Sequence, residues 1–314
     1  MVTIPKESWI GAIKAIAFGA TEDEGGMRDK KVLLGGETTL PFLSFEGKVS
    51  KPVIGMEVID RVREDYPQMI IAEFGDAITD PVAWAQACVD TYGADFICLK
   101  LLSTNPEEEN ASAEDAAVLV STMLEQVKAP LMIQGSGDYE KDARVMELCA
   151  DAAKGERCLL ARAEQDSYKS IAVAATANDH AVVAFSNIDV NIAKQLNIML
   201  TEFGVPLDRI VSDPLMAAVG FGMEYAYSAM ERIKLAGLMG DKMLQSPMIA
   251  DVSTAWSAKE AYRVDAKLGD EKERAIFWEV STALAALMAG ANALILRHPR
   301  SLAVTRKVVN ELTG

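Results

Sequence analysis

Polar side chains stand at the ends of short apolar runs throughout this 314-residue sequence. Acids, amides and cations collected at one edge would form a ring of hydrogen-bond donors and acceptors, suited to a large ligand held by many polar contacts. The set lacks a serine or cysteine with a clear base partner and lacks the usual spacing of a metal trio. Its members are Glu73, Asp76, Lys100, Gln134, Arg162, Asn187, Asp213, Asp251, Arg297 and His298.

Two of these side chains could recognise a heterocycle. Asn187 in "FSNIDVN" and Asp213 in "SDPL" offer an amide and a carboxylate, which can pair with the donor–acceptor edge of a pterin. For three of the polar residues, a purely structural role stays open. Asp213 could instead cap a following helix, Lys100 could form a structural ion pair with Glu73, and His298 is typical of a packed histidine at a rim.

The stretch "PLMIQGSGDYEKD" combines an apolar run, a glycine turn and a capped helix start. Gly135-Ser136-Gly137 lacks the third glycine of a dinucleotide-binding fingerprint, and the Walker pattern is absent. At the end of a barrel strand, such glycines would let the backbone approach a ligand. The alternative is a tight turn that binds nothing, and the loop by itself favours neither.

Composition excludes several classes of function. Acidic residues outnumber basic ones by 46 to 31, which gives a net charge of −15 and makes nucleic acid and anionic membranes poor partners. Four cysteines without a C-x-x-C pair and two histidines argue against a metal or iron–sulfur site built by this chain alone. We expect a cytoplasmic protein, because the N-terminal stretch is no signal peptide and no segment is typical of a membrane span.

The elements that must position the polar ring are short strands alternating with helices. Eight strand–helix units in roughly 250 residues are what a (β/α)8 TIM barrel requires. In this α/β fold the active site lies at the carboxyl ends of the strands. We therefore predict one domain, with an N-terminal extension and hairpin over residues 1–66 and the barrel over residues 67–314. The expected strands are Met69–Phe74, Phe96–Leu102, Leu131–Gln134, Cys158–Ala163, Ala181–Phe185, Arg209–Ser212, Met248–Val252 and Ala293–Arg297.

Helix starts between these strands are marked by capping residues. Asp80 before a proline, Ser112 in a capping-box pattern, Asp138 and Asp189 each precede an apolar-periodic stretch. The alanine-rich segment Ser281–Leu296 carries a glycine and an asparagine, which favours a buried helix, a turn and a strand over a membrane span.

Several long motifs together resemble one family, the small (delta) subunit of the corrinoid iron–sulfur protein of the acetyl-CoA synthase/carbon monoxide dehydrogenase system. The resemblance spans nearly the whole chain, and that family is itself related to pterin-dependent methyltransferases. The motifs that carry it are "LLGGETTLPF", "EFGDAITDP", "PLMIQGSGDYEKDARVMEL", "AFSNIDVNIAKQLNIML", "DPLMAAVGFGMEYAYSAMERIKLAGL" and "ADVSTAWSAKEAY".

The resemblance implies a heterodimer in which this chain covers a cobalamin held by a large subunit, and that partner also carries a [4Fe–4S] cluster. A methyltransferase would deliver a methyl group from methyltetrahydrofolate to the cobalt, and acetyl-CoA synthase would receive it. This chain would have no catalytic residues and no metal ligands of its own. The alternatives are a stand-alone pterin-dependent methyltransferase, and a barrel enzyme of another chemistry on the same scaffold.

The resemblance also indicates which residues meet the cofactor. In related folate-binding methyltransferases an asparagine and the aspartate of a D-P-L motif hold the pterin, and these match Asn187 and Asp213 here. For this chain we expect the barrel-top residues to line the corrinoid pocket instead: Gln134, Gly135, Ser136, Arg162, Asn187 and Asp213.

Overall fold

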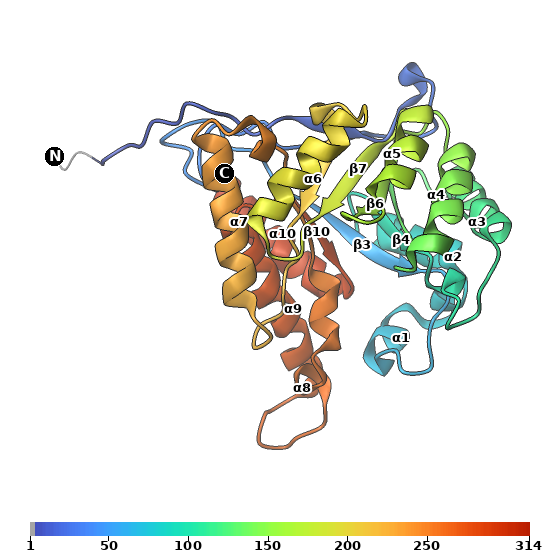
Figure 1. Ribbon diagram of the computed structural model, residues 1–314. Coiled ribbons are helices and arrows are strands. Elements are labelled where there is room, and N and C mark those ends of the chain that lie inside the picture. Colours follow the sequence, from blue (N-terminus) through green and yellow to red (C-terminus); the bar gives the residue numbers. More distant parts are fainter. Residues whose placement is uncertain (1–3) are drawn as a thin grey trace.

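Eight short parallel strands form the centre of the molecule (Figure 1). The structure is a computed structural model that describes residues 4–314. Along the sheet the strands follow the order β8-β7-β6-β5-β4-β3-β10-β9. The Ser212 amide donates to the Pro247 carbonyl at 2.9 Å and brings β8 against β9, so the sheet is nearly closed into the predicted (β/α)8 barrel. The strands are β3 (Val53–Ile59), β4 (Ile97–Lys100), β5 (Leu131–Gln134), β6 (Leu159–Ala163), β7 (Ala181–Phe185), β8 (Ile210–Asp213), β9 (Ile249–Asp251) and β10 (Ala293–Leu296).

Helices surround this sheet on the outside, and their starts follow the predicted caps. Asp80, Ser112, Asp138 and Asp189 each accept a hydrogen bond from a backbone amide in the first turn of the helix that follows. The helices are α1 (Gln68–Phe74), α2 (Pro81–Gln86), α3 (Ala113–Gln126), α4 (Tyr139–Ala152), α5 (Tyr168–Ala177), α6 (Val190–Glu202), α7 (Met223–Leu238), α8 (Lys259–Tyr262), α9 (Glu271–Met288) and α10 (Pro299–Thr313).

The first barrel strand differs from the prediction. Residues 69–74 belong to helix α1, and the strand that opens the barrel is β3, so the barrel begins at Val53 rather than at residue 67. Six of the seven residues of β3 are buried, which leaves no alternation of apolar and polar residues to distinguish it from a helix segment. The other seven expected strands are all present.

The N-terminal hairpin also differs in its pairing. Its strands are β1 (Ile16–Phe18) and β2 (Val32–Leu34), whereas the stretch KVLLGGETTLPFLSFEGKVSKPV, residues 31–53, predicts a hairpin within itself. Phe18 inserts edge-to-face against Phe96 of the barrel, with ring centroids 5.4 Å apart. The hairpin therefore closes the amino-terminal end of the barrel as an apolar plug, and Figure 1 shows this blue segment crossing that end.

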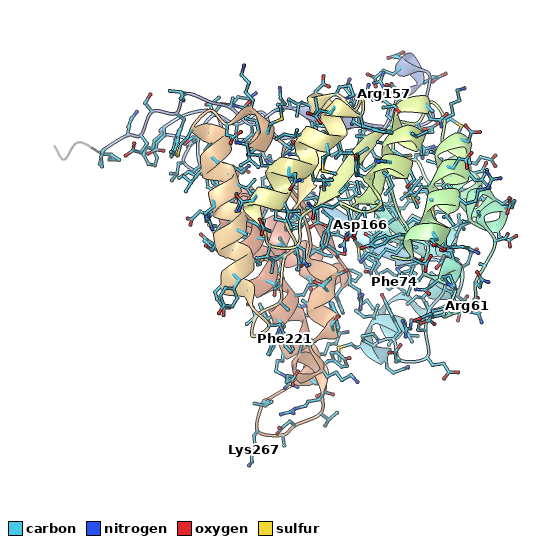
Figure 2. All side chains as sticks on the ribbon, in the orientation of Figure 1. Arg61, Phe74, Arg157, Asp166, Phe221 and Lys267 are labelled. Carbon is cyan, nitrogen blue, oxygen red and sulfur yellow. The ribbon has the colours of Figure 1, made fainter. Side chains whose placement is uncertain are left out.

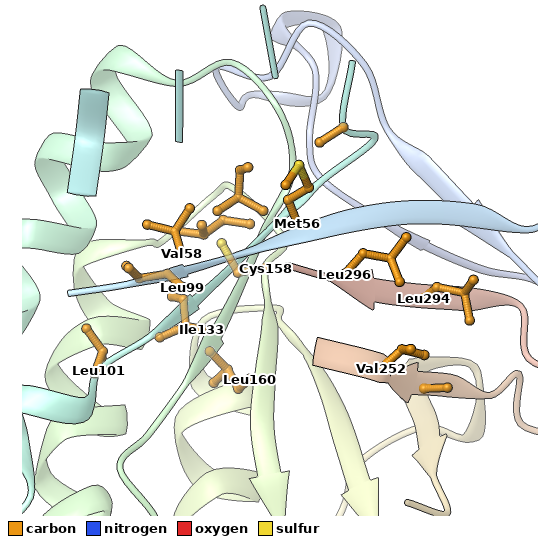
Figure 3. Packing of buried hydrophobic residues seen from close by; sticks show 14 of the residues in the cluster. Met56, Val58, Leu99, Leu101, Ile133, Cys158, Leu160, Val252, Leu294 and Leu296 are labelled. Atoms are coloured by element: carbon orange, nitrogen blue, oxygen red, sulfur yellow. The ribbon is translucent and has the colours of Figure 1, made fainter. Parts of the chain in front are cut away.

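Two apolar layers hold the fold together. Outward-facing residues of the strands pack against the helices in one apolar cluster, and Figure 3 shows Met56, Leu99 and Leu294 among its members. Inward-facing residues fill the barrel interior below the mouth. Gly55 lies in this inner layer because a β-carbon there would fall 2.4 Å from the Phe96 ring. The four cysteines are buried free thiols, and burial raises the pKa of Cys149 and Cys158 to about 12.

The segment Ser281–Leu296 adopts the predicted helix, turn and strand. Among residues 4–314, we find no helix with the length and apolar character needed to span a bilayer.

Candidate functional site

The last inward-facing position of most strands is polar. In a strand the side chains alternate between two faces, so the residue two beyond an inward apolar residue also points inward. Phe96 and Cys98 are followed in this way by Lys100, Val211 by Asp213, and Ile295 by Arg297. The same alternation in β3, β5 and β9 adds three more residues. A polar layer thus lies directly above the apolar interior, at the barrel mouth. Arg162 joins these six residues out of alternation, where the pairing of β6 with β7 shifts in register between Leu160 and Ala163. The complete layer contains Glu57, Lys100, Gln134, Arg162, Asp213, Asp251 and Arg297.

Lys100 is the centre of this layer. Its Nζ lies 2.6 Å from Glu57 Oε2 and 2.7 Å from Asp251 Oδ2, and it donates to Ser253 Oγ at 3.0 Å. The Ser253 hydroxyl also lies 2.6 Å from Glu57 Oε2 and from Asp251 Oδ1. One ammonium therefore ties β3, β4 and β9 together across the barrel axis, and all its donors have acceptors.

Arg297 anchors the opposite side of Glu57. Its Nε donates to Glu57 Oε1 at 2.7 Å and its Nη2 to Oε2 at 3.2 Å, a two-pronged pair that is among the stronger side-chain contacts in proteins. The guanidinium lies 4.9 Å from the centre of the Tyr66 ring, and the Tyr66 hydroxyl donates to Glu57 Oε1 at 3.3 Å. Glu57 is fully buried and is held by two cations.

Arg162 bridges the two aspartates. Its Nη2 donates to Asp251 Oδ2 at 3.3 Å, and its Nε lies 3.2 Å from Asp213 Oδ2 without the alignment of a hydrogen bond. Its guanidinium stacks 4.7 Å from the centre of the Phe185 ring. The layer thus holds three cations, Lys100, Arg162 and Arg297, against three carboxylates, and it is electrically neutral.

Burial and pairing set the protonation of this layer. Burial acts to raise the pKa of Glu57, but Arg297 and Lys100 outweigh it and hold that pKa far below its usual range. Asp251 behaves alike, since Lys100 and Arg162 overcome the effect of burial and lower its pKa. Burial dominates at Asp213, whose pKa is raised because Arg162 compensates only in part. The pKa of Lys100 is raised by the two carboxylates that it contacts.

An open pocket of about 1120 Å³ lies over the polar layer. Its walls carry the aromatic side chains of Tyr66, Trp256 and Tyr262 above the buried charges. Trp256 is fixed between Tyr262 and His298, with ring planes only 11° apart on the His298 side. The loops after the strands surround this end of the molecule, and Figure 2 shows Arg61 and Phe74 lying away from Arg157, which precedes β6.

A second, smaller pocket of about 580 Å³ adjoins the first and includes the glycine loop. The Asp142 carboxylate accepts hydrogen bonds from the amides of Ser136 and Gly137, at 2.9 and 2.8 Å, and from the Ser136 hydroxyl. Gly135 permits this arrangement because a β-carbon there would fall 2.3 Å from the same carboxylate. The loop is therefore a turn built around an internal anion, and it lines a pocket without offering those amides to a phosphate.

The six expected site residues occupy three places. Gln134 and Arg162 form the wall shared by the two pockets, whereas Gly135 and Ser136 line the smaller one only. Asp213 lies beneath Arg162 with 1% of its surface exposed, and it caps no helix directly because α7 begins ten residues later. Asn187 is exposed in the loop after β7, in a left-handed backbone conformation with φ 44°.

Glu73 and Asp76 do not lie at a strand end, since Glu73 is part of helix α1 and Asp76 lies in the turn that follows it. Glu73 pairs with Lys272 at 3.1 Å, so the proposed Lys100–Glu73 ion pair is wrong. His298 is a packed histidine, fully buried, whose Nδ1 accepts from the Arg300 amide. Burial lowers the pKa of His298 to about 4, which keeps the ring neutral.

Sequence reasoning missed Glu57, the most heavily paired acid of the layer. Its strand, β3, falls within residues 1–66, the range predicted as an N-terminal extension and hairpin, so the sequence does not indicate that Glu57 lies at a barrel strand end. The signal was a single carboxylate inside the apolar run "VIGMEVI", because an isolated acid in a buried strand needs a cationic partner.

Solved structures with the same fold include dihydropteroate synthases, which places this chain among the TIM-barrel proteins. The enzyme from Coxiella burnetii in complex with pteroic acid matches with a TM-score of 0.59 and 14% identity, over 96% of this chain and 98% of that one. The Xanthomonas albilineans enzyme in complex with 7,8-dihydropteroate matches with a TM-score of 0.58 and 15% identity, over 84% and 95%. At these identities the likeness shows the fold alone.

The chain belongs to the CO dehydrogenase/acetyl-CoA synthase delta subunit family, whose model matches residues 15–305. The acetyl-CoA decarbonylase/synthase complex subunit delta of Archaeoglobus fulgidus is 37% identical over 98% of this chain and 70% of its own length. Subunit delta 1 of Methanosarcina thermophila is also 37% identical, over 98% and 72%. Both relatives are named as subunits of an acetyl-CoA decarbonylase/synthase complex.

Proposed function

We propose that this chain is the small subunit of a heterodimeric corrinoid iron–sulfur methyl carrier, and that its barrel mouth covers a cobalamin held by a larger subunit. The observation that carries the proposal is the neutral, internally paired layer beneath a wide aromatic pocket, in a member of the delta subunit family. The larger subunit would also carry a [4Fe–4S] cluster. A methyltetrahydrofolate methyltransferase and acetyl-CoA synthase are the proposed exchange partners.

The residues of the mouth suit a corrinoid. A corrin is a broad, mostly apolar macrocycle with amide arms, so it needs apolar or aromatic walls and neutral hydrogen-bonding groups. Tyr66, Trp256 and Tyr262 supply the aromatic walls, and Gln134 supplies an amide at the shared wall of the two pockets. When bound, cobalamin supplies a cobalt centre that accepts and releases a methyl group.

The role of this chain would be to shield and position rather than to transfer protons. Lys100 is held by two carboxylates that raise its pKa, so it stays protonated and cannot act as a base. Glu57 and Asp251, whose pKa values are lowered, remain carboxylates. The layer therefore presents a fixed, neutral floor, which keeps water and protons away from a reactive metal centre above it.

The mouth end also offers a surface for a partner. Phe221 in the loop after β8 is 55% exposed, and Val264 in the projecting loop after α8 is 85% exposed. Figure 2 shows Phe221 and Lys267 at this end of the molecule. Exposed apolar side chains beside a pocket are typical of a surface that another protein covers.

A stand-alone pterin-dependent methyltransferase is less well supported. The aspartate that such an enzyme would use, Asp213, is covered by Arg162, and Asn187 lies outside both pockets. The two polar groups that sequence reasoning assigned to a pterin edge thus do not face one ligand.

The test is anaerobic reconstitution of this chain with its larger corrinoid-bearing subunit. We expect an equimolar complex in which cobalt absorbance is lost to air more slowly than in the larger subunit alone. Lys259→Glu reverses a charge on the rim of the mouth pocket and is expected to weaken the complex. Lys154→Glu, an exposed lysine after α4 at the other end of the barrel, is the matched control. A chain that elutes alone and colourless, or equal effects of the two variants, would refute the proposal.

A further inference from the structure

A third pocket, of about 290 Å³, lies at the end of the barrel opposite to the mouth. Pro52 and Asn292, which line it, stand directly before strands β3 and β10. Residues 38–48 border this pocket as a closed loop, in which the Thr38 amide donates to the Lys48 carbonyl at 2.9 Å and the Lys48 amide donates to the Thr38 hydroxyl at 3.0 Å. Compact surface loops with joined ends are Ω-loops, and they are frequently functional.

A buried ion pair forms the floor of this pocket. Lys234 Nζ lies 2.5 Å from Glu37 Oε1 and donates to Asn292 Oδ1 at 3.2 Å. Asn292 Nδ2 donates to Glu37 Oε1 at 2.9 Å, and the Ser50 hydroxyl donates to Glu37 Oε2 at 2.9 Å. Gly290 makes room for the lysine, because a β-carbon there would fall 2.6 Å from Lys234 Cε. The floor is therefore preorganised and electrically neutral.

One hydrogen-bond donor of this floor is left over. An ammonium has three N–H donors, yet within residues 4–314 Lys234 has two acceptors, Glu37 and Asn292. Lys234 is 2% exposed and lines the pocket, and a buried donor without an acceptor is costly. Burial lowers the pKa of Lys234 although Glu37 acts to raise it. The ammonium would therefore gain from one more acceptor inside the pocket.

The walls above this floor are apolar, and one of them is held in place at a cost to the backbone. Phe42 has φ 62° and occupies the third position of a turn in which the Leu43 amide donates to the Leu40 carbonyl at 3.3 Å. Glycine or asparagine is usual at such a position, and an aromatic residue there is strained. The Phe42 side chain nevertheless packs against the apolar core. The apolar wall residues are Leu40, Pro41, Phe42, Val49, Pro52 and Leu287.

We propose that this pocket binds a small neutral molecule with a hydrogen-bond-accepting oxygen on a compact apolar body, and that the Ω-loop of residues 38–48 is its cover. The oxygen would be the third acceptor of Lys234, and the apolar body would contact the walls. A neutral ligand is favoured because Lys234 and Glu37 already balance, so a charged ligand would add an uncompensated buried charge. The size of the pocket fits only a small molecule, since ligand pockets usually measure about 300–1,000 Å³. The site does not depend on what the mouth covers.

The experiment is a titration of the full chain with cyclohexanol, followed by saturation-transfer NMR of the ligand. We expect saturable binding to wild type with a Kd on the order of 1 mM. Ala291→Leu, which extends a buried side chain of the pocket lining, should abolish binding. Ala152→Leu on the exposed face of α4 is the matched control and should bind like wild type. Lys234→Met/Glu37→Gln removes the donor without leaving a buried charge and should weaken binding at least about tenfold.

Hydrogen exchange locates the bound molecule. Cyclohexanol should slow amide exchange within residues 38–48 of wild type, because a filled pocket holds the cover closed, and it should have no such effect on Ala291→Leu. Three results would overturn the inference: no saturable binding to wild type, equal binding by a folded Ala291→Leu, or unchanged exchange of residues 38–48. Equal binding by a folded Lys234→Met/Glu37→Gln would overturn the role of the ammonium. If that double variant does not fold, Ala291→Leu and the exchange measurement still decide the outcome.

Discussion

Replacing Lys100 by methionine keeps the length of the side chain and removes the ammonium at the centre of the polar layer. Glu57 would keep both contacts from Arg297, at 2.7 and 3.2 Å. Asp251 would lose its 2.7 Å cation and keep Arg162, at 3.3 Å, as its remaining cation, together with the Ser253 hydroxyl at 2.6 Å. The cost therefore falls on Asp251, a carboxylate with 2% of its surface exposed.

Removing one partner of a buried ion pair destabilises a protein by about 3–5 kcal/mol, because the other charge is left without compensation. Asp251 retains the long Arg162 contact and the Ser253 hydroxyl, and it can take up a proton, so we expect the lower end, about 3 kcal/mol, from Lys100→Met. In Lys100→Met/Asp251→Asn the orphaned charge is gone. The double variant should therefore be more stable than the single one, with a coupling energy of at least about 1 kcal/mol.

The loss should also depend on pH. Asp251 has a folded pKa below its ordinary value of about 3.9, so its pairing adds stability above that pH and loses it as the pH falls through the folded pKa. The difference between wild type and Lys100→Met should consequently narrow under acid conditions. Urea unfolding followed by circular dichroism from neutral to acid pH measures this, with Lys307→Met on the exposed face of α10 as the control. The reasoning is refuted if Lys100→Met is as stable as the control, or if the difference in stability between wild type and Lys100→Met becomes larger at acid pH.

Three further outcomes follow from other parts of the structure. Phe18→Ala removes the aromatic ring that packs against Phe96, and thermal denaturation should show a decrease of about 3–5 kcal/mol in the free energy of unfolding. A decrease of less than about 1 kcal/mol would contradict a stabilising role of the hairpin as an apolar plug. Gly135→Ala places a methyl group against the Asp142 carboxylate and should cost about 1–3 kcal/mol in urea unfolding, whereas a neutral effect would contradict the close approach. Burial raises the pKa of Glu279, so wild type should gain stability relative to Glu279→Gln as the pH falls through that raised value; melting curves showing the opposite trend would contradict this.

Much of the fold followed from local patterns in the sequence. Strands β4 to β10 are apolar runs bounded by capped helices, and each cap at Asp80, Ser112, Asp138 and Asp189 is formed by a contact within three residues. Such features depend on neighbours in the chain, so a single sequence reveals them. Eight strand–helix units in a chain of this length then favoured a TIM barrel, because that fold has eight such units.

The first strand and the site partners depend on contacts that are distant in the chain. Helix α1 and strand β3 are both apolar segments of seven residues, and only pairing of β3 with β4 and β10 separates strand from helix. Glu57 and Lys100 are 43 residues apart, and Lys100 and Asp251 are 151 apart. Spacing in the sequence does not indicate such a pairing, which is why the alternative partner considered for Lys100 was Glu73 rather than Glu57 or Asp251.

The two sides of the polar layer should respond differently to substitution. Glu57, Lys100 and Arg297 are linked by contacts of 2.6 and 2.7 Å and have exposures of 16% or less, so loss of one charge leaves another buried and unpaired. Arg162 sits at the edge, reaches solvent, and spreads two long contacts over two acids. Water can therefore partly replace it, and the raised pKa of buried Asp213 makes it easier for this carboxylate to take up a proton once the guanidinium is gone. Variation is better tolerated at residue 162 than at the other two cations, and that side of the barrel mouth is where a change of ligand can arise without loss of the fold.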